Sequence, residues 1–244
     1  MIALILAAGY GTRLYPLTKD LPKALLPVKE RTILDHLVEK LDVQKMGIEK
    51  IVLVSNHKYA EKFRQWGKSA RLDAPPVVLD DGSLSEADRL GSVGDMVFAI
   101  RAEQIDKDLL VLGSDNLFCD PLDGFVQFAR MKSPAITLGA YELPDRRFAS
   151  HYGVLTTAGE KVIQLDEKPS SPSSSLISTA VYFFPRRTVG LVLEYVGLKK
   201  SADTLGSFIH WLLSRESVFA YPFRGPWFDI GDAASYTHAQ ESFK

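Results

Sequence analysis

The chain has 244 residues, of which 46% are hydrophobic and 24% are charged, and its 29 basic and 30 acidic residues leave a net charge of -1. These values are typical of a globular protein and exclude disorder of the whole chain. A balanced charge also argues against a nucleic-acid-binding protein, which normally carries a basic excess. Small molecules are therefore the expected partners.

Residues 1–8 are apolar, but they lack a charged n-region and end at a Gly-Tyr-Gly turn. This run is too short for a signal peptide or a membrane span, so we interpret it as a buried strand. Cys119 is the only cysteine, which excludes an internal disulfide and a thiolate zinc site and favours a reducing compartment. We expect a cytoplasmic protein with no membrane partner.

Apolar runs alternate with segments of helical period through the first half of the chain. This alternation is typical of βαβ units around a mostly parallel sheet. Apolar positions repeat at helical spacing in 33–46 and 93–105, which predicts two helices packed on that sheet. Successive strands are predicted at 2–7, 50–55, 77–79 and 109–113.

The second half differs, because its predicted strands follow one another closely enough to be antiparallel neighbours. The Pro- and Ser-rich stretch at 169–175 is interpreted as an exposed loop and not as an interdomain linker. We expect one α/β domain over 1–244, with helices flanking a mixed, mostly parallel central sheet. The second half is predicted to contain strands at 135–141, 153–156, 161–165, 176–184 and 218–223, and helices at 187–196, at 204–213 and from 233 onward.

A glycine-rich loop follows the first strand, with Gly9 and Gly11 at its centre. Glycines at the carboxyl end of a parallel strand let backbone N–H groups approach an anion closely. The loop is neither a P-loop, which needs Lys-Ser or Lys-Thr after its last glycine, nor a dinucleotide fingerprint, which needs a third glycine where Leu14 stands. Because Arg13 and Lys23 add two cations, the loop predicts a triphosphate site.

Residues 6–28 read Leu-Ala-Ala-Gly-x-Gly-Thr-Arg-Leu-x-Pro-Leu-Thr-x-x-x-Pro-Lys-x-Leu-Leu-Pro-Val and resemble the signature of the sugar-1-phosphate nucleotidylyltransferases, above all of glucose-1-phosphate thymidylyltransferase-like members. The resemblance implies a single-domain, Rossmann-like nucleotide-diphospho-sugar transferase fold. Within it, the nucleotide-binding half would cover about 1–118 and the sugar-binding half about 119–244. The implied nucleotide contacts are Leu6, Ala8, Gly9, Gly11, Thr12, Arg13, Lys23, Gly91 and Gly94.

The segment at 90–95, Leu-Gly-Ser-Val-Gly-Asp, is similar to the Leu-Gly-Thr-Ala-Gly stretch that abuts the base in this family. The preceding residues 80–89 depart from the family's versions, so the resemblance leaves the identity of the base open. An alternative interpretation is a polar loop leading into a helix with Ser92 as its N-cap.

Two aspartates are implied as magnesium ligands. The strand and turn at 109–118 resemble the family's Gly-Asp-Asn strand, with Ser114 in place of a glycine, and this match assigns Mg²⁺ binding to Asp115. Trp-Phe-Asp-Ile-Gly-Asp at 227–232 resembles the motif of the second ligand, Asp229. Carboxylate oxygens suit this hard cation, although Asp115 by position alone could equally be a turn former. Asp232 is the better N-cap for the last helix.

Three segments resemble the sugar-side motifs of the family: Tyr-Gly-Val at 152–154, Asp-Glu-Lys-Pro at 166–169 and the strand at 178–182, in which Ala180 replaces a glycine. A carboxylate beside an ammonium suits a ligand with both hydroxyls and a phosphate. The alternative for residues 166–169 is an exposed charged turn. The alternative for Trp227, in the motif at 227–232, is a position in the core. The implied sugar-phosphate contacts are Gly153, Glu167, Lys168, Thr179 and Trp227.

The implied reaction joins a nucleoside triphosphate and a sugar 1-phosphate into an NDP-sugar and pyrophosphate, with Arg13, Lys23, Asp115 and Asp229 as catalytic residues and Mg²⁺ as cofactor. Glucose-1-phosphate thymidylyl or uridylyl transfer is the first expectation, and mannose-1-phosphate guanylyl transfer is its main rival. Cytidylyl transfer to a phosphate such as phosphocholine is a further alternative. A non-catalytic nucleotide sensor is an alternative of another class, but it predicts loss of at least one of those four residues, and all are present. The sequence does not indicate an oligomeric state.

Overall fold

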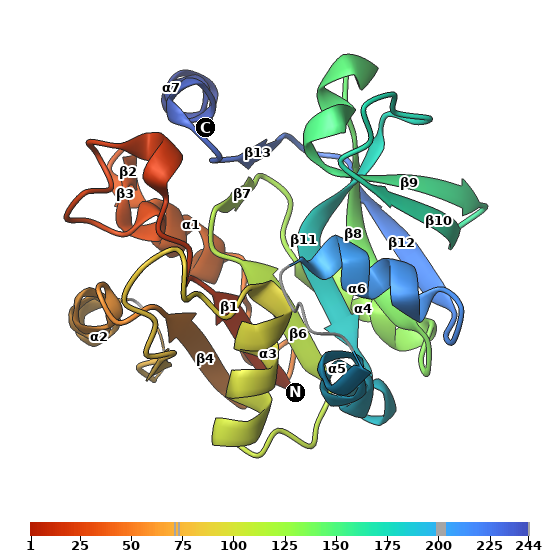
Figure 1. Ribbon diagram of the computed structural model, residues 1–244, viewed down its shortest axis with the longest axis horizontal. Helices are drawn as coiled ribbons and strands as arrows, with labels where there is room; N and C mark the ends of the chain where they lie inside the picture. Colours follow the sequence, from red (N-terminus) through yellow and green to blue (C-terminus); the bar gives the residue numbers. More distant parts are fainter. Residues whose placement is uncertain (71, 73, 199–203, 244) are drawn as a thin grey trace.

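The computed structural model describes residues 1–70, 72, 74–198 and 204–243. Within these residues the main sheet has nine strands in the order β5-β4-β1-β6-β11-β8-β12-β10-β9 (Figure 1). The first-half strands are parallel to one another and consist mainly of aliphatic residues, as expected for strands covered on both faces. They are β1 (Ile2–Leu6), β4 (Lys50–Ser55), β5 (Val77–Asp80) and β6 (Leu109–Gly113), which confirms the predicted strands.

The second half adds antiparallel strands and so makes the sheet mixed, as predicted. One strand of this half, β11 (Leu176–Phe184), pairs directly with β6 and joins the two halves in one sheet. The other strands are β8 (Ile136–Glu142), β9 (Gly153–Ala158), β10 (Lys161–Glu167) and β12 (Val218–Phe223). Two short strands, β7 (Asn116–Phe118) and β13 (Trp227–Asp229), form a separate pair.

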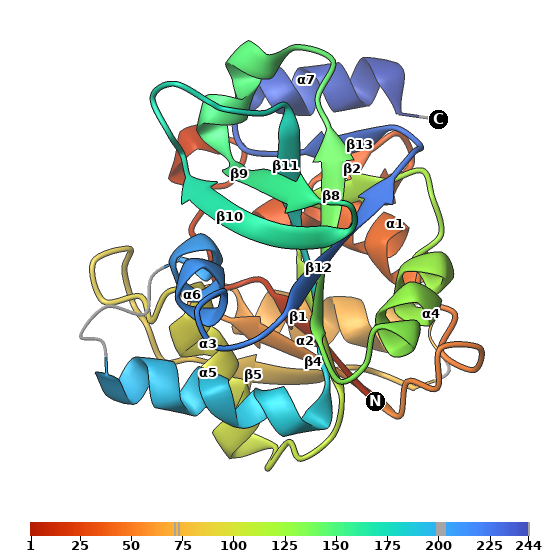
Figure 2. The same ribbon diagram turned by 90° about the vertical axis from the view of Figure 1, so that its right-hand side faces the viewer.

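Helices cover both faces of the sheet (Figure 2). One face packs against α1 (Ile33–Glu39), α2 (Ala60–Ser69) and α4 (Asp123–Met131), and the other against α3 (Ser92–Ala102), α5 (Arg186–Leu198) and α6 (Leu205–Leu212). The last helix, α7 (Ala233–Ser242), lies over a third apolar cluster, and Asp232 is its N-cap as predicted. The short elements are η1 (Thr12–Leu14), η2 (Lys23–Leu25), η3 (Arg146–His151), β2 (Pro27–Val28) and β3 (Arg31–Thr32).

The helix predicted at 33–46 is half as long as expected, because α1 ends at Glu39. Thr32 caps its start by accepting a hydrogen bond from the Asp35 amide. Beyond the helix, the Asp42 carbonyl accepts from the Met46 amide at 2.8 Å and closes a separate turn. The Asp42 side chain also supports this turn, because its Oδ1 accepts from the Lys45 amide at 2.9 Å. The apolar spacing therefore continues past the point where the backbone leaves the helix.

The alternative that Ser92 caps α3 is wrong. The N-cap is Gly91, with φ 77° and ψ 164°, a conformation that a residue with a Cβ rarely adopts. Helix α3 also ends before the predicted residues 103–105, where Gln104 takes a positive φ of 50°. Helices α2 and α4 lie outside all the predicted ranges.

Ala180 has a φ of 55°, in the left-handed region that favours glycine. It lies in β11 where the register with β8 shifts, so the strand bulges at this point. The resembling family strand has glycine here. Ser114, the other replaced glycine, does not adopt a positive φ.

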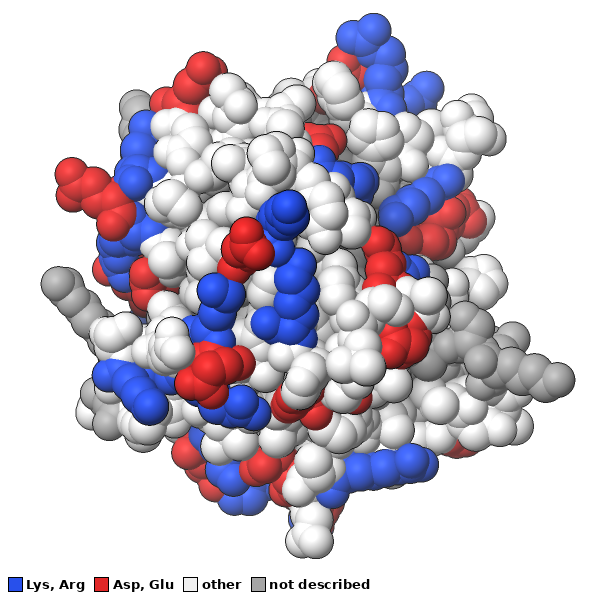
Figure 3. All heavy atoms as spheres, turned by 60° about the vertical axis from the view of Figure 1, so that its left-hand side comes forward, with Lys and Arg blue, Asp and Glu red and all other residues white. Residues whose placement is uncertain are grey.

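On the face shown in Figure 3, basic and acidic side chains of the described residues are interspersed, in keeping with the net charge of -1. In the described part of the chain, no helix combines the length and the apolar character that crossing a bilayer requires.

Candidate active site

The glycine-rich loop leaves β1 and is held in one shape by its own polar contacts. Gly11 has a φ of 63°, and a Cβ there would lie 3.3 Å from Thr18 Cγ2, so both conformation and space favour glycine. The Thr18 hydroxyl donates to the Gly11 carbonyl at 2.7 Å, and the Tyr59 hydroxyl donates to the Thr18 carbonyl at 2.5 Å. Gly9, Thr12 and Arg13 are left exposed, as an anion-binding loop requires.

The loop lies at the carboxyl ends of the parallel strands, which is where ligands bind in open α/β sheets. Around it, the carbonyl of Ala8 accepts from Asn56 Nδ2 at 2.9 Å, and the carbonyl of Leu6 accepts from the Ser114 amide at 3.2 Å. Gly91 and Gly94 begin α3 beside β1. The predicted nucleotide contacts in the glycine-rich loop and at the start of α3 therefore lie at the same end of the parallel strands.

The two predicted metal ligands meet across the β7–β13 pair. Asp229 pairs in register with Asn116, and the Ile230 amide donates to the Asp115 carbonyl at 2.9 Å. The side chains also act on each other electrostatically. Burial and then the charge of Asp115 raise the pKa of Asp229 to about 7, partly offset by Lys23 and Arg13.

Lys23 is the cation closest to this pair, with its Nζ 2.6 Å from Asp115 Oδ2. Burial opposes ionisation of Asp115, but the charge and hydrogen bond of Lys23 outweigh it and hold the pKa of this carboxyl below its ordinary value. Arg13 also faces the pair, because its guanidinium and Asp229 Oδ2 both lie within 4 Å of the position that a Cβ of Gly231 would take. The glycine-rich loop and the two aspartates thus lie at one site.

Trp227 acts on this site through Asn116. Its Nε1 donates to Asn116 Oδ1 at 2.7 Å, and Asn116 Nδ2 donates to Asp115 Oδ1 at 2.9 Å. The indole is 8% exposed, and its ring centroid lies 5.5 Å from those of Tyr141 and Tyr152. Trp227 therefore orients a predicted metal ligand from a core position.

The β9–β10 hairpin brings three of the predicted sugar-side residues together. Gly153 and Glu167 pair in register, and the Lys168 amide donates to the Tyr152 carbonyl at 3.0 Å. Burial raises the pKa of Glu167, partly offset by Lys168. Thr179 does not join them at the surface, because it is fully buried with its Oγ1 against Gly139.

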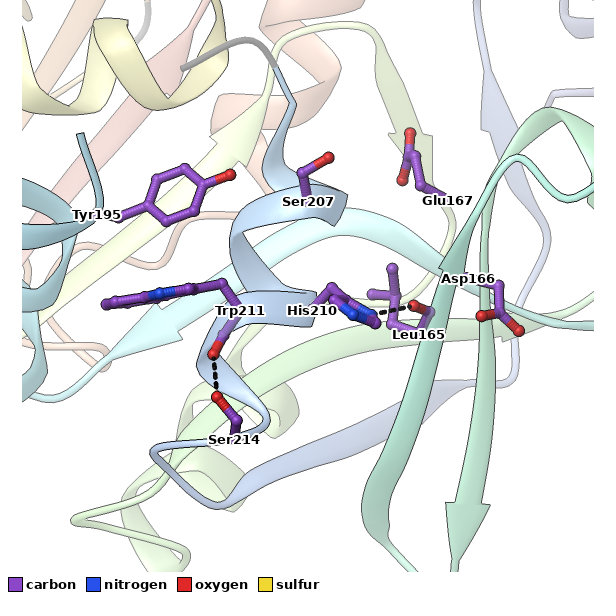
Figure 4. A pocket seen from close by; sticks show the side chains of 8 residues that line it. All are labelled: Leu165, Asp166, Glu167, Tyr195, Ser207, His210, Trp211 and Ser214. Atoms are coloured by element: carbon purple, nitrogen blue, oxygen red, sulfur yellow. Dashed lines mark hydrogen bonds between the residues drawn. The ribbon is translucent and has the colours of Figure 1, made fainter. Parts of the chain in front are cut away.

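A pocket of about 580 Å³ adjoins the hairpin and shares Glu167 with it. Figure 4 shows Glu167 and Asp166 from β10 on one side and the rings of Tyr195 and Trp211 on the other. His210 Nδ1 lies 3.1 Å from the Leu165 carbonyl and ties α6 to β10.

Sequence reasoning missed two residues of this region. The ring of Tyr152 packs against Trp227 with the centroids 5.5 Å apart, and burial and then the charges of Asp229, Asp232 and Asp115 raise its pKa. Its position next to Gly153 in the quoted motif was the available signal. Gly206 in α6 lies under Glu167, where a Cβ would be 1.8 Å from Glu167 Oε2. No local pattern marks a helical glycine for such a contact.

In the described residues, no group of three or more His, Cys, Asp or Glu side chains is placed to hold a metal ion. A dication held by Asp115 and Asp229 would therefore take its other ligands from substrate phosphates and water, as Mg²⁺ commonly does. The donor set fits Mg²⁺, because it consists of carboxylates and lies beside a predicted phosphate site.

The sequence profile of the family described as "Nucleotidyl transferase" matches residues 2–244. The chain is 32% identical over 234 residues to the "Putative mannose-1-phosphate guanyltransferase" of Sulfolobus acidocaldarius, covering 96% of this chain and 60% of that protein. It is 28% identical to the "Bifunctional protein GlmU" of Methanocaldococcus jannaschii, covering 95% of this chain and 51% of that protein. The chain thus spans about half to three fifths of these relatives' length.

The fold is similar to the crystal structure of a "Putative Glucose-1-Phosphate Thymidylyltransferase" from Bacillus anthracis, with a TM-score of 0.84, 22% identity and coverage of 99% of this chain and 94% of that chain. This similarity confirms the single-domain α/β fold. The family match over residues 2–244 shows that the chain belongs to the nucleotidyl transferase family.

Proposed function

We propose that this protein transfers a nucleotidyl group from a nucleoside triphosphate to a sugar 1-phosphate and releases an NDP-sugar and pyrophosphate. The observation that carries the proposal is the meeting of Asp115 and Asp229 beside Lys23, at the sheet edge that holds the glycine-rich loop. The family match and the name of the Sulfolobus relative support the same reaction.

In this reaction an oxygen of the sugar 1-phosphate forms a bond to the α-phosphorus while the bond from that phosphorus to pyrophosphate breaks. The attacking phosphate is already anionic, so no protein nucleophile is needed. The chain instead positions two polyanions and stabilises the charge that develops on the leaving pyrophosphate. Arg13 and Lys23 neutralise the triphosphate, Lys168 neutralises the 1-phosphate, and Glu167 accepts hydrogen bonds from sugar hydroxyls.

Asp115 and Asp229 would hold Mg²⁺, which supplies positive charge shared by both phosphate groups when it is bound. The electrostatics of the residues fit this role. Partial burial and then the charge of Asp115 raise the pKa of Asp229, and a bound cation would offset this cost of ionising Asp229. Lys23 relieves it only in part.

Each half of the fold is assigned one of the two substrates. We assign the nucleotide to residues of about 1–118, with the nucleoside against Leu6, Ala8, Gly9, Gly91 and Gly94. We assign the sugar 1-phosphate to residues of about 119–244, with contacts at Gly153, Glu167 and Lys168. The sugar itself is assigned as glucose or mannose. The reaction is placed in the cytoplasm, where nucleoside triphosphates are available.

The test is pyrophosphate release over a matrix of nucleoside triphosphates and sugar 1-phosphates, with and without Mg²⁺. Release is expected to require a sugar 1-phosphate and Mg²⁺, and Asp115→Asn is expected to lower it by about a hundredfold or more. Asp106→Asn is the matched control, because Asp106 is exposed and pairs with Arg186 away from this site. Nucleotide binding without pyrophosphate release from any pair would contradict the proposal and favour a regulatory subunit.

A further inference from the structure

Both carboxylate oxygens of Asp115 accept hydrogen bonds from side chains of this protein. Oδ1 accepts from Asn116 Nδ2 at 2.9 Å, and Asn116 is itself held by Trp227 Nε1 at 2.7 Å. Oδ2 accepts from Lys23 Nζ at 2.6 Å. Asn116 is buried, whereas the side chains of Lys23 and Asp115 are 17% and 29% exposed. The contact at Oδ1 is therefore fixed, and Oδ2 is the oxygen at which one partner can replace another.

Lys23 is placed so that its ammonium can reach either Asp115 or the glycine-rich loop. Its Cβ lies 3.5 Å from the position that a Cβ of Gly11 would take, so the side chain starts against the loop. Its backbone is held at the start of η2, where the Leu26 amide donates to the Lys23 carbonyl at 3.0 Å. The ammonium ends a flexible four-carbon stem and binds as a point charge. It can therefore change its anionic partner while the backbone stays in place.

A metal ion on Asp115 would meet the charge of Lys23. Two positive charges a few ångströms apart repel each other strongly where solvent screens them poorly. As long as the ammonium stays on Oδ2, it lowers the affinity of Asp115 for a dication. A triphosphate at the glycine-rich loop offers the ammonium other anionic oxygens, and its departure frees Oδ2.

We propose that Lys23 occupies the metal-binding oxygen of Asp115 in the substrate-free protein and moves to the triphosphate when it binds, so that Mg²⁺ is held tightly only together with the nucleotide. The exchange couples the two binding events, because the triphosphate removes the charge that opposes the metal ion. The inference rests on the proposed function and adds to it an order in which the site fills.

The test is Mg²⁺ binding to the protein without nucleotide, measured by calorimetry at constant pH. Lys23→Met removes the charge and is expected to bind Mg²⁺ about tenfold or more tighter than the wild type, although it should lose pyrophosphate release. Lys23→Arg keeps the charge and is expected to bind Mg²⁺ as weakly as the wild type. Lys19→Met is the matched control, because Lys19 is exposed in the same loop and its replacement changes the net charge equally.

A folded Lys23→Met variant that binds Mg²⁺ no tighter than the wild type would overturn the proposal. An equal gain in Lys19→Met would also overturn it, because the gain would then reflect net charge alone. Lys23→Gln serves if Lys23→Met does not fold, since glutamine lacks the charge but can still donate to Asp115. The melting temperature of each variant shows whether it is folded, and Mg²⁺ should raise it more in the uncharged variants than in the wild type.

Pyrophosphate release separates this proposal from the proposed function. Release by the wild type without a gain in Mg²⁺ affinity on loss of the Lys23 charge contradicts the exchange alone. The gain in affinity without release from any pair of substrates contradicts the transfer reaction alone.

Discussion

The carboxylate of Glu167 lies directly over the backbone of Gly206, where a Cβ would be 1.8 Å from Glu167 Oε2. The glycine is the second residue of α6, and its missing side chain makes the space that the carboxylate occupies. Helix α6 therefore decides where the predicted sugar-binding carboxylate sits, although the two residues are on different elements.

Gly206→Ala is expected to displace Glu167 and to raise the KM for the sugar 1-phosphate about tenfold, with little change in the KM for the triphosphate. The fold is expected to tolerate the change, because the clashing atom is the end of a flexible side chain and alanine favours a helix by about 1 kcal/mol over glycine. Steady-state kinetics with each substrate varied in turn measures the effect. Gly190→Ala in α5 is the control, since no described atom lies within 4 Å of its added Cβ. Equal kinetics for the two variants would contradict a positioning role for Gly206.

Mg²⁺ binding is expected to weaken below about pH 7. Burial and Asp115 raise the pKa of Asp229 to about 7, so a proton competes with the metal ion below that pH. The dissociation constant for Mg²⁺ is expected to rise about fivefold as the pH falls from 7 to 6 and to level off above 8. Calorimetry with the protein alone avoids protonation of the nucleotide. A dissociation constant that does not change between pH 6 and 8 would contradict competition between a proton and Mg²⁺ at Asp229. Asp229→Asn should abolish the pH dependence.

Asp95 is expected to make the protein less stable as the pH rises. Its pKa is raised from 3.8 to about 8, mainly by burial, so between about pH 4 and 8 the folded chain holds a proton that the unfolded chain has lost. The free energy of unfolding therefore falls with increasing pH across this range. Asp229 shifts in the same direction, and comparison of the wild type with Asp95→Asn isolates the effect of Asp95.

The unfolding free energy of Asp95→Asn, relative to that of the wild type, should accordingly increase as the pH rises from 5 to 8. Urea unfolding at both pH values, and at one between them, measures this gain. If the difference in unfolding free energy between the two proteins stayed constant with pH, Asp95 would not be buried as a neutral acid.

Ala180→Gly is expected to stabilise the fold by about 0.5 kcal/mol. At a φ of 55° an alanine is strained by about 1–2 kcal/mol, and glycine recovers this but loses more entropy on folding. Ala158→Gly at the end of β9 is the control, since Ala158 is exposed and has no positive φ. The control should destabilise the protein, and urea midpoints for the two variants should move in opposite directions. A shift of both midpoints in the same direction would show that Ala180 is unstrained.

The sequence by itself determined the features that contiguous residues encode. Apolar β-branched runs indicated the strands, and Asp232 indicated the start of the last helix. These features depend on backbone preferences and side-chain alternation within a few residues. Local pattern failed after α1, where the Asp42 side chain accepts from the Lys45 amide and stabilises a separate turn.

Only the tertiary structure decided which distant residues share a site. The β7–β13 pair brings Asp229 to Asp115, the start of α6 brings Gly206 under Glu167, and the loop after β5 brings Asp81 to the first turn of α3. The order of strands and the packing of helices on the sheet set these contacts, and no short stretch of sequence contains both partners. Burial then changed their chemistry, because desolvation and neighbouring charge raise the pKa values of Asp229 and Asp95 only after the chain has folded.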